Sequence, residues 1–252
     1  GSHMLDRERL KLAACLWLAG MTGVVALSWG VLPRLLQTLP SSLPLPVAVT
    51  INMLQSAALV GLAVWVGTVL AKPVGLHAPV TESALTGTGM WRALKPQMLP
   101  ATVVGLVVGV LLARLTVLSP EPLRVLSAEV DVPVWVRLLY GGITEEILMR
   151  WGLMTALVWL LWRVLQNRVG PPTTSLFIAA IVLEAILFGV GHLPAAWAMG
   201  VELDGSVVMF IIVGNAVPGV LFGWLYWRWG LEAAVMAHAL SHAAVAATAA
   251  FG

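Results

Sequence analysis

The hydrophobic positions of this chain fall into seven long apolar segments separated by shorter polar connections. The segments cover approximately residues 12–32, 47–71, 99–118, 134–165, 174–199, 206–228 and 231–250. About 20 apolar residues are enough for a helix to cross the roughly 30 Å hydrocarbon core of a bilayer. The pattern therefore predicts an all-α fold, a polytopic transmembrane helix bundle of about seven spans, within a range of six to eight.

The connections between the predicted spans are rich in proline and polar residues. The longest connection runs from Lys72 to Pro100, and within it residues 90–94 are expected to form a short interfacial helix. Gly230 is the only clear break between the last two segments, so these are expected to form a tight helical hairpin. Gly1-Ser2-His3 is interpreted as a tag remnant, and residues 1–4 are therefore excluded from the site.

The composition agrees with a membrane protein. Of the 252 residues, 60% are hydrophobic and only 10% are charged, whereas about a quarter of the residues are charged in ordinary soluble domains. The single cysteine, Cys15, excludes an intramolecular disulfide and a cysteine-based metal cluster. No basic stripe is present, so no nucleic-acid partner is predicted. We predict a multi-pass protein of the bacterial inner membrane.

The distribution of lysine and arginine predicts the orientation, because cytoplasmic loops carry an excess of these residues. One set of connections holds Arg7, Arg9, Lys11, Lys72, Arg92, Lys95, Arg163, Arg168 and Arg228. The opposite set is mixed or acidic and holds Arg34, Glu121, Arg124, Glu129, Asp131, Glu202 and Asp204. The N-terminus is therefore predicted to be cytoplasmic and the C-terminus to lie outside.

Candidate chemistry begins in the fourth segment, where Glu145, Glu146 and Arg150 interrupt an apolar run. Ionisable residues at bilayer depth are costly, so such a cluster is by default a functional site. Glu146 and Arg150 are four residues apart, share one helix face and are interpreted as a structural ion pair. Glu145 is then left without its own cation, and a desolvated carboxylate can take a proton from water. We predict that Glu145 is a general base.

A second cluster ends the fifth segment. Glu184, Phe188 and His192 follow one another at intervals of four residues and form one stripe on a helix. The stripe makes His192 a second candidate for the site, and Glu184 is either an accessory acid or a helix-capping acid. Gly189 and Gly191 are expected to allow close approach of another helix, as small residues do in membrane interfaces.

The last segment places His238 and His242 on one helix face, directed toward one pocket. Two chemistries remain open for this pair: zinc binding with a carboxylate such as Glu145 as third ligand, or hydrogen bonding to a developing oxyanion. The zinc signature His-Glu-x-x-His is absent because Ala239 follows His238. A rise of about 1.5 Å per residue places these residues and His192 at similar depth in the outer half of the bilayer. We expect them to meet in one water-filled cavity.

The three clusters resemble a known family when they are taken in order. The pattern Glu-Glu-x-x-x-Arg at 145–150, Phe-x-x-x-His at 188–192 and the later His238 are similar to the motifs of the CPBP intramembrane protease family. This family is also called Abi or CAAX-protease-like, and it includes the type II CAAX prenyl proteases and the myxosortases. The resemblance assigns residues 131–252 to a catalytic helical core and leaves residues 5–130 as N-terminal transmembrane helices.

The resemblance implies a glutamic intramembrane endopeptidase that needs no cofactor. Glu145 with His192 would activate water, and His238 with the residue four positions later would stabilise the oxyanion. Glu146, Arg150 and Phe188 would support these groups structurally. The prenyl proteases typically carry asparagine four residues after the last histidine, and here that residue is His242. Because imidazole can also bind metal, the glutamic and zinc mechanisms both remain open.

The predicted partner is a membrane-associated or C-terminally anchored protein or peptide substrate. A site that opens to the outer side argues against a cytosolic prenylated substrate and favours the myxosortase-like branch. The alternatives are a zinc-dependent membrane protease of the same fold, a non-enzymatic bacteriocin-immunity-like membrane protein and a proton-coupled transporter. The sequence determines neither the scissile bond nor the oligomeric state.

Overall fold

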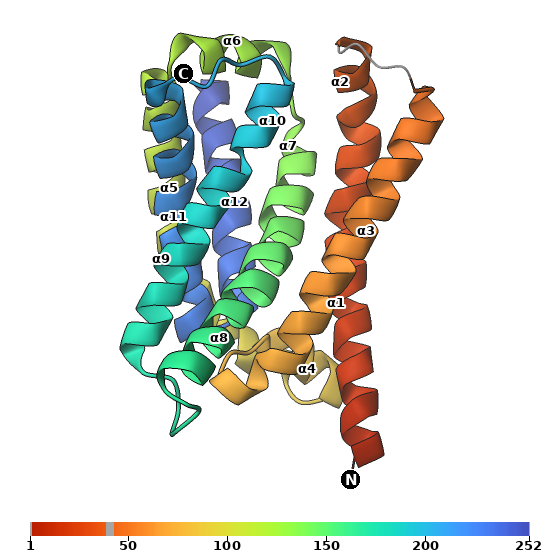
Figure 1. The fold of residues 1–252 in the computed structure, drawn as a ribbon, viewed down its shortest axis with the longest axis vertical. Coiled ribbons are helices and arrows are strands. Elements are labelled where there is room, and N and C mark those ends of the chain that lie inside the picture. The colour runs from red at the N-terminus through yellow and green to blue at the C-terminus, as the bar shows by residue number, and fades with distance from the viewer. Residues whose placement is uncertain (1, 39–42, 252) are drawn as a thin grey trace.

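The computed structural model describes residues 2–38 and 43–251, and within these ranges it is helical without strands (Figure 1). Seven helical segments are long and apolar enough to cross a membrane: Asp6–Thr38, Leu45–Leu70, Met90–Leu118, Val134–Leu165, Thr174–Ala198, Gly205–Arg228 and Leu231–Phe251. The predicted all-α polytopic bundle is confirmed. Gly1, the first residue of the predicted tag remnant, lies outside the described residues.

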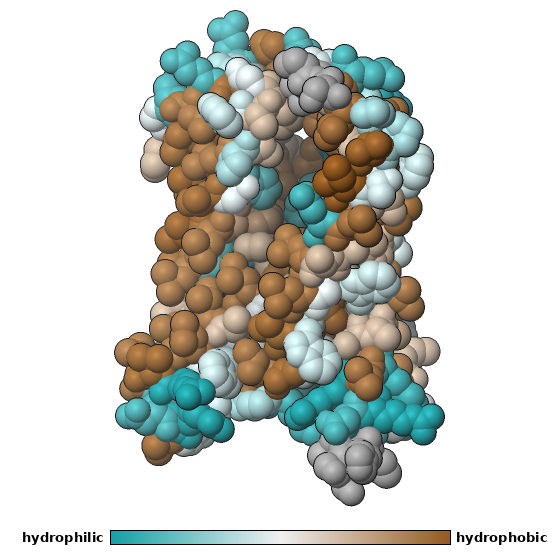
Figure 2. Space-filling view, turned by 45° about the vertical axis from the view of Figure 1, so that its right-hand side comes forward, coloured by the Kyte–Doolittle hydropathy of each residue, from teal (hydrophilic) through white to brown (hydrophobic). Residues whose placement is uncertain are grey.

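The two ends of the chain lie at opposite ends of the bundle, as an odd number of spans requires (Figure 1). Figure 2 shows a broad hydrophobic band around the visible face, with hydrophilic residues gathered at both ends. Apolar side chains exposed in a continuous band are the surface that lipid tails cover. The protein is therefore a multi-pass membrane protein, and its orientation stays a prediction.

One of the N-terminal helices, α5 (Met90–Leu118), differs from the prediction. The helices are α1 (Ser2–Gly30), α2 (Leu32–Thr38), α3 (Leu45–Leu70), the short η1 (Lys72–Val74), α4 (Pro79–Thr86) and α5. The expected interfacial helix at 90–94 is wrong, because α5 continues through Pro96 and Pro100 without a break. Membrane helices tolerate proline where neighbouring groups satisfy the freed backbone, so these prolines do not mark the end of a connection.

The central span is not a regular α-helix. It consists of α7 (Val134–Val136), the π-helical segments η2 (Arg137–Thr144) and η3 (Ile147–Met154), and α8 (Thr155–Leu165). π-Helical turns are rare and frequently lie at functional sites. Regular helix geometry was therefore the wrong assumption for this segment. Glu145 and Glu146 lie between the two π-helical segments.

The C-terminal half supplies the remaining helices. They are α6 (Glu121–Glu129), which lies across the end that holds the C-terminus (Figure 1), α9 (Thr174–Gly191), α10 (Leu193–Ala198), α11 (Gly205–Arg228) and α12 (Leu231–Phe251). The predicted fifth span is interrupted at His192, because Pro194 lacks the N–H needed to continue α9. Gly230 joins α11 to α12 with a φ of 130°, which confirms the expected hairpin.

The two glycines near the end of α9 behave differently. A Cβ on Gly189 would lie 2.6 Å from the carbonyl oxygen of Ile212, so this glycine allows α9 and α11 to approach closely, as predicted. A Cβ on Gly191 would meet no atom within 4 Å, so the same prediction is wrong for Gly191. Gly189 is buried against α11, whereas Gly191 is exposed.

The central span is enclosed by other helices, and this enclosure positions the site. It packs against α1, α3, α9 and α12. The hydroxyl of Thr144 donates a hydrogen bond of 2.6 Å to the carbonyl oxygen of Gly20 in α1, which fixes the span against that helix. Polar side chains on the inner faces of the central span, α9 and α12 are thereby brought together inside the bundle.

Candidate active site

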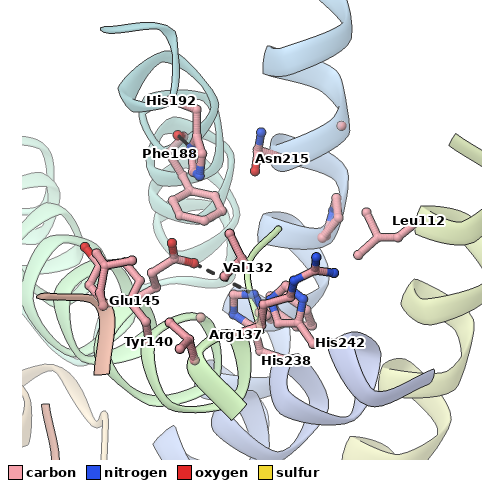
Figure 3. A pocket seen from close by; sticks show the side chains of 16 residues that line it. Leu112, Val132, Arg137, Tyr140, Glu145, Phe188, His192, Asn215, His238 and His242 are labelled. Carbon is pink, nitrogen blue, oxygen red and sulfur yellow. Dashed lines mark hydrogen bonds and ion pairs between the residues drawn. The ribbon is translucent and has the colours of Figure 1, made fainter. Parts of the chain in front are cut away.

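A cavity of about 300 Å³ lies among these helices. Figure 2 shows a hollow in the visible face with hydrophilic residues inside it, and Figure 3 shows the lining side chains of the cavity. The lining includes the four predicted site residues Glu145, His192, His238 and His242, which come from three different spans. The expectation that these residues meet in one cavity is confirmed, whereas their individual roles stay predictions.

His238 is held between two rings and a carboxylate. Its imidazole stacks on Phe222 at a centroid distance of 4.6 Å and on His242 at 4.9 Å. Its Nδ1 lies 2.6 Å from Oε1 of the fully buried Glu146. Because an ionised carboxylate only accepts hydrogen bonds, Nδ1 is the donor and carries a proton. The other ring nitrogen, Nε2, is left to face the cavity.

Glu145 faces that second nitrogen. Its Oε2 lies 3.8 Å from Nε2 of His238, and its side chain is 20% exposed. This separation exceeds a direct hydrogen bond, but a water molecule can bridge two groups at such a distance. Within the described ranges, Glu145 has no lysine or arginine within ion-pair distance. This carboxylate therefore lacks its own cation, as the sequence predicts.

His192 lies at the junction of α9 and α10. Its Nδ1 is 2.7 Å from the carbonyl oxygen of Phe188, so Nδ1 is the donor and Nε2 is free to accept. The Phe188 ring meets the imidazole edge to face at a centroid distance of 4.7 Å. His192 and Glu145 line the same cavity, but no direct contact joins their side chains in the described structure. The predicted pair therefore needs a bridging water or substrate.

Arg150 connects two buried carboxylates beneath the cavity. Its Nε lies 3.3 Å from Oε2 of Glu146, which confirms the predicted ion pair. Its Nη1 lies 3.2 Å from Oε1 of Glu184, and its Nη2 donates a hydrogen bond of 3.0 Å to the carbonyl oxygen of Gly219. Sequence analysis missed both the second partner of Arg150 and the contact between Glu146 and His238. Glu146 therefore links the charged network to an imidazole of the cavity.

Two aromatic rings, those of Phe188 and Phe222, also contact the guanidinium group of Arg150. The guanidinium carbon lies 5.4 Å from the ring centroid of Phe188 and 5.6 Å from that of Phe222. Both distances are within the range of cation–π attraction. Phe188 thus contacts both Arg150 and His192, and the structural support predicted for it agrees with this position.

Most of the residues that line this cavity lie in a part of the chain that resembles a known protein family. Residues 130–244 match the family model described as type II CAAX prenyl endopeptidase, Rce1-like. This part, somewhat less than half of the chain, is similar to the Rce1-like family, within the CPBP family, and is called the Rce1-like core below. The similarity supports a CAAX-type intramembrane protease, which acts on a protein substrate in a lipid bilayer. The predicted resemblance is confirmed, and the myxosortase-like branch stays a prediction. Searches of curated proteins and of solved structures gave no match.

Three further residues of the Rce1-like core line the cavity, and sequence analysis missed them. Arg137, Tyr140 and Asn215 line the same cavity. The Nδ2 of Asn215 donates a hydrogen bond of 2.8 Å to the carbonyl oxygen of Ile211, and Figure 3 shows the Asn215 side chain between His192 and His242. An uncharged amide inside an apolar segment was the available signal, but the sequence argument considered only ionisable groups.

The donors of the Rce1-like core do not fit the zinc alternative. Among residues 2–38 and 43–251, no group of three or more His, Cys, Asp or Glu side chains is arranged to hold a metal ion. The rings of His238 and His242 are stacked with an interplanar angle of 25°. Zinc requires donors that converge tetrahedrally. Among the described residues, Glu145, His238 and His242 do not form such a group.

The described side chains in the cavity that could act as nucleophiles are limited to a carboxylate, imidazoles and a phenol. None of the described residues that line it is serine, threonine, cysteine or lysine. Ser241, next to His242 in sequence, is buried and donates a hydrogen bond of 2.7 Å to the carbonyl oxygen of His238. Covalent catalysis by a hydroxyl or thiol needs such a group beside a base. The described lining therefore offers no hydroxyl of serine or threonine, no thiol and no lysine amine as a nucleophile.

Gly141 of the Rce1-like core allows the histidine pair to lie against η2. A Cβ at this position would lie 2.6 Å from Nε2 of His242 and 3.6 Å from Nε2 of His238. We expect Gly141→Ala to lower kcat/KM about tenfold to a hundredfold, because small displacements of reacting groups have effects of this size. The measurement is substrate cleavage by protein whose thermal unfolding has been checked.

Gly191→Ala is the matched control, because its new methyl group meets no atom within 4 Å. It should cleave the substrate at the normal rate. Equal activity of the two alanine variants would show that the approach of the histidines to Gly141 does not matter for the reaction.

Proposed function

We propose that this protein is a glutamic intramembrane endopeptidase, which hydrolyses a peptide bond of a membrane-anchored or C-terminally anchored protein through a water molecule activated by Glu145. The observation that carries the proposal is the position of Glu145, which faces Nε2 of His238 across 3.8 Å in a cavity without Ser, Thr, Cys or Lys among its described lining residues. A base, an imidazole and space for water are what metal-independent hydrolysis requires.

The reaction follows from these groups. Glu145 removes a proton from the water as its oxygen attacks the carbonyl carbon of the scissile bond. His192 helps to orient the water, because its Nε2 can accept a hydrogen bond while Nδ1 is engaged by the carbonyl oxygen of Phe188. The C–N bond then breaks, and the proton on Glu145 passes to the leaving nitrogen. Water is thereby divided between the new carboxyl group and the new amine.

His238 stabilises the negative charge that develops on the carbonyl oxygen. The buried Glu146 accepts the hydrogen bond from Nδ1 and holds the ring with Nε2 toward the cavity, where a proton on Nε2 can be donated to the oxyanion. His242, stacked on His238, supplies the second donor. This role for Glu146 goes beyond the ion pair with Arg150 that sequence analysis assigned to it, since one carboxylate serves both the arginine and the imidazole.

The cavity favours a peptide as substrate. Arg137 and Asn215 place a guanidinium and an amide in the lining, and both can hydrogen-bond to the backbone groups of an extended chain. The exposed apolar surface of the bundle suits the hydrophobic anchor of a membrane protein. Cleavage near the outer surface, as in the myxosortase-like branch, is proposed from the loop charges. Cysteine-accessibility labelling that places the C-terminus inside would overturn this orientation.

Comparative proteomics of membrane fractions tests the function directly. Cells that carry the wild-type protein are compared with cells that carry Glu145→Gln. A membrane-anchored precursor should accumulate in the variant, and its mature product should disappear. The position of the new product end in wild-type cells identifies the scissile bond. Unchanged processing in the variant would instead support the non-enzymatic alternative.

The mechanism predicts that activity does not depend on zinc. Dialysis against a chelator should leave the cleavage rate unchanged, and His242→Asn should retain activity within about tenfold, because an amide N–H can replace the imidazole N–H as donor. The measurements are cleavage kinetics and metal content of the purified protein. Loss of activity on chelation that is restored by added zinc would establish the metal-dependent alternative.

A further inference from the structure

A second cavity, of about 280 Å³, lies at the end of the bundle that holds the N-terminus. It is formed where α1, the end of α3, η1, α4 and the central span meet. Its lining residues are Glu8, Arg9, Lys11, Leu12, Thr68, Ala71, Lys72, His77, Glu82, Leu85, Thr86 and Trp151. It shares no residue with the candidate active site, so it requires its own explanation.

Three cations line this second cavity: Arg9, Lys11 and Lys72. None of them has an ion-pair partner in the part of the chain that the structure describes. An unpaired cation cluster around a cavity attracts an anion, and basic pockets between transmembrane helices bind lipid headgroups. The unpaired charges therefore indicate an anionic group as the ligand.

The acidic residues of the lining do not cancel this charge. Glu82 lies 3.6 Å from Nδ1 of His77 and accepts a hydrogen bond from the backbone N–H of Ala78. The hydrogen bond to Glu82 raises the pKa of His77 above its ordinary value. Glu8 and Glu82 are the acids of the lining, and the three cations outnumber these two acids even when His77 is uncharged. The cavity is therefore net positive.

The inner wall is apolar and fixed. Leu12, Leu85 and Trp151 line it, and the Trp151 indole donates a hydrogen bond of 3.3 Å to the carbonyl oxygen of Val64. Thr68, also in the lining, has a buried hydroxyl without a hydrogen-bond partner among the described residues. Buried polar groups normally have partners. A cationic rim above an apolar wall, next to the end of the apolar α3, fits an amphiphile at the bilayer surface.

We propose that this cavity binds the phosphodiester headgroup of a membrane phospholipid. The phosphate lies among Arg9, Lys11 and Lys72, and the glycerol end rests on the apolar wall formed by Leu12 and Trp151. Lys72 follows the α3 span directly, which places the cation at the level where headgroups lie. The proposal is independent of the catalytic mechanism, because it uses none of the proposed catalytic residues.

Binding to the purified, delipidated full-length protein in a neutral detergent tests the proposal. Short-chain phosphatidylglycerol should raise the thermal unfolding temperature in a saturable way, whereas the matching diacylglycerol, which lacks phosphate, should not. Arg9→Gln and Lys72→Gln should each weaken the lipid affinity about fivefold, the effect of one cation near a phosphate at the membrane surface. Native mass spectrometry gives the dissociation constants.

Arg7→Gln is the matched control, because Arg7 lies on the same helix, carries the same charge and does not line the cavity. It should leave the affinity unchanged. Equal weakening by Arg7→Gln and Arg9→Gln would show general attraction of lipid to the basic end and overturn the site. Equal stabilisation by diacylglycerol, or a full effect from inorganic phosphate at the same concentration, would exclude a phospholipid headgroup as the ligand.

Discussion

Glu145→Gln is expected to lower kcat for peptide-bond cleavage by about 10²- to 10⁴-fold, the range that general-base catalysis contributes. The amide has the size of the carboxylate but cannot take a proton from water. The fold should be unaffected, since the only ion-pair partner of Glu145 in the described structure is His238, at 3.8 Å. The measurement is cleavage of the precursor identified by proteomics, with thermal unfolding recorded on the same preparation.

Glu202→Gln serves as the control for this prediction, because Glu202 is exposed and lies outside the cavity. It should process the precursor at the wild-type rate. Normal processing by Glu145→Gln would remove the general base from the mechanism. Loss of processing together with a lower unfolding temperature would assign Glu145 a structural role instead.

Arg150→Met is expected to lower the free energy of unfolding by about 3–5 kcal/mol, the usual cost of removing one partner from a buried charge network. Arg150, Glu146 and Glu184 are all fully buried, so the substitution leaves two carboxylates without their cation. It also leaves the carbonyl oxygen of Gly219 without its side-chain donor. Thermal or denaturant unfolding of the purified protein in detergent measures the loss.

A second substitution separates charge from packing in this prediction. The double variant Arg150→Met, Glu184→Gln should be more stable than Arg150→Met alone, because it contains one fewer unpaired buried carboxylate. Arg163→Met is the control at an exposed arginine on the same span, and it should change stability by less than about 1 kcal/mol. A double variant that is no more stable than the single variant would mean that lost packing, not charge, causes the destabilisation.

The two predictions distinguish the roles of neighbouring residues on one span. Glu145 borders the cavity and should affect catalysis with little effect on stability. Arg150 lies beneath the cavity and should affect both, because Glu146 connects it to His238. Residues 144–150 therefore present the proposed base Glu145 to the cavity and the structural residue Arg150 to α9 and α11.

Much of the fold could be predicted because the length of an apolar segment is enough to identify a membrane span. The seven predicted segments correspond to the seven observed spans, and the main error lies at α5, where Pro96 and Pro100 lie inside a helix. Local pattern cannot distinguish a proline that ends a helix from one that a membrane helix tolerates, because the difference depends on whether neighbouring groups satisfy the freed backbone.

Sequence analysis predicted four of the residues that line the cavity, but it missed Arg137, Tyr140 and Asn215 and most of the contacts. Glu145, His192, His238 and His242 were found because ionisable groups in apolar spans are conspicuous, and similar depth indicated that they meet. The hydrogen bond between Glu146 and His238 joins residues 92 positions apart. The spacing of residues within one helix cannot predict a contact between residues so far apart in the sequence. The interpretation of Glu146 as only a partner of Arg150 was therefore incomplete.

The sequence by itself determined the membrane-spanning class, the number of spans and the residue types that carry the chemistry, because each depends on composition and local spacing. Only the tertiary structure decided which carboxylate faces which imidazole. The physical reason is that side-chain direction in the central span depends on π-helical turns and on packing against α1 and α12. Glu145 and Glu146 are adjacent in the chain, yet packing directs one to the cavity and buries the other between Arg150 and His238.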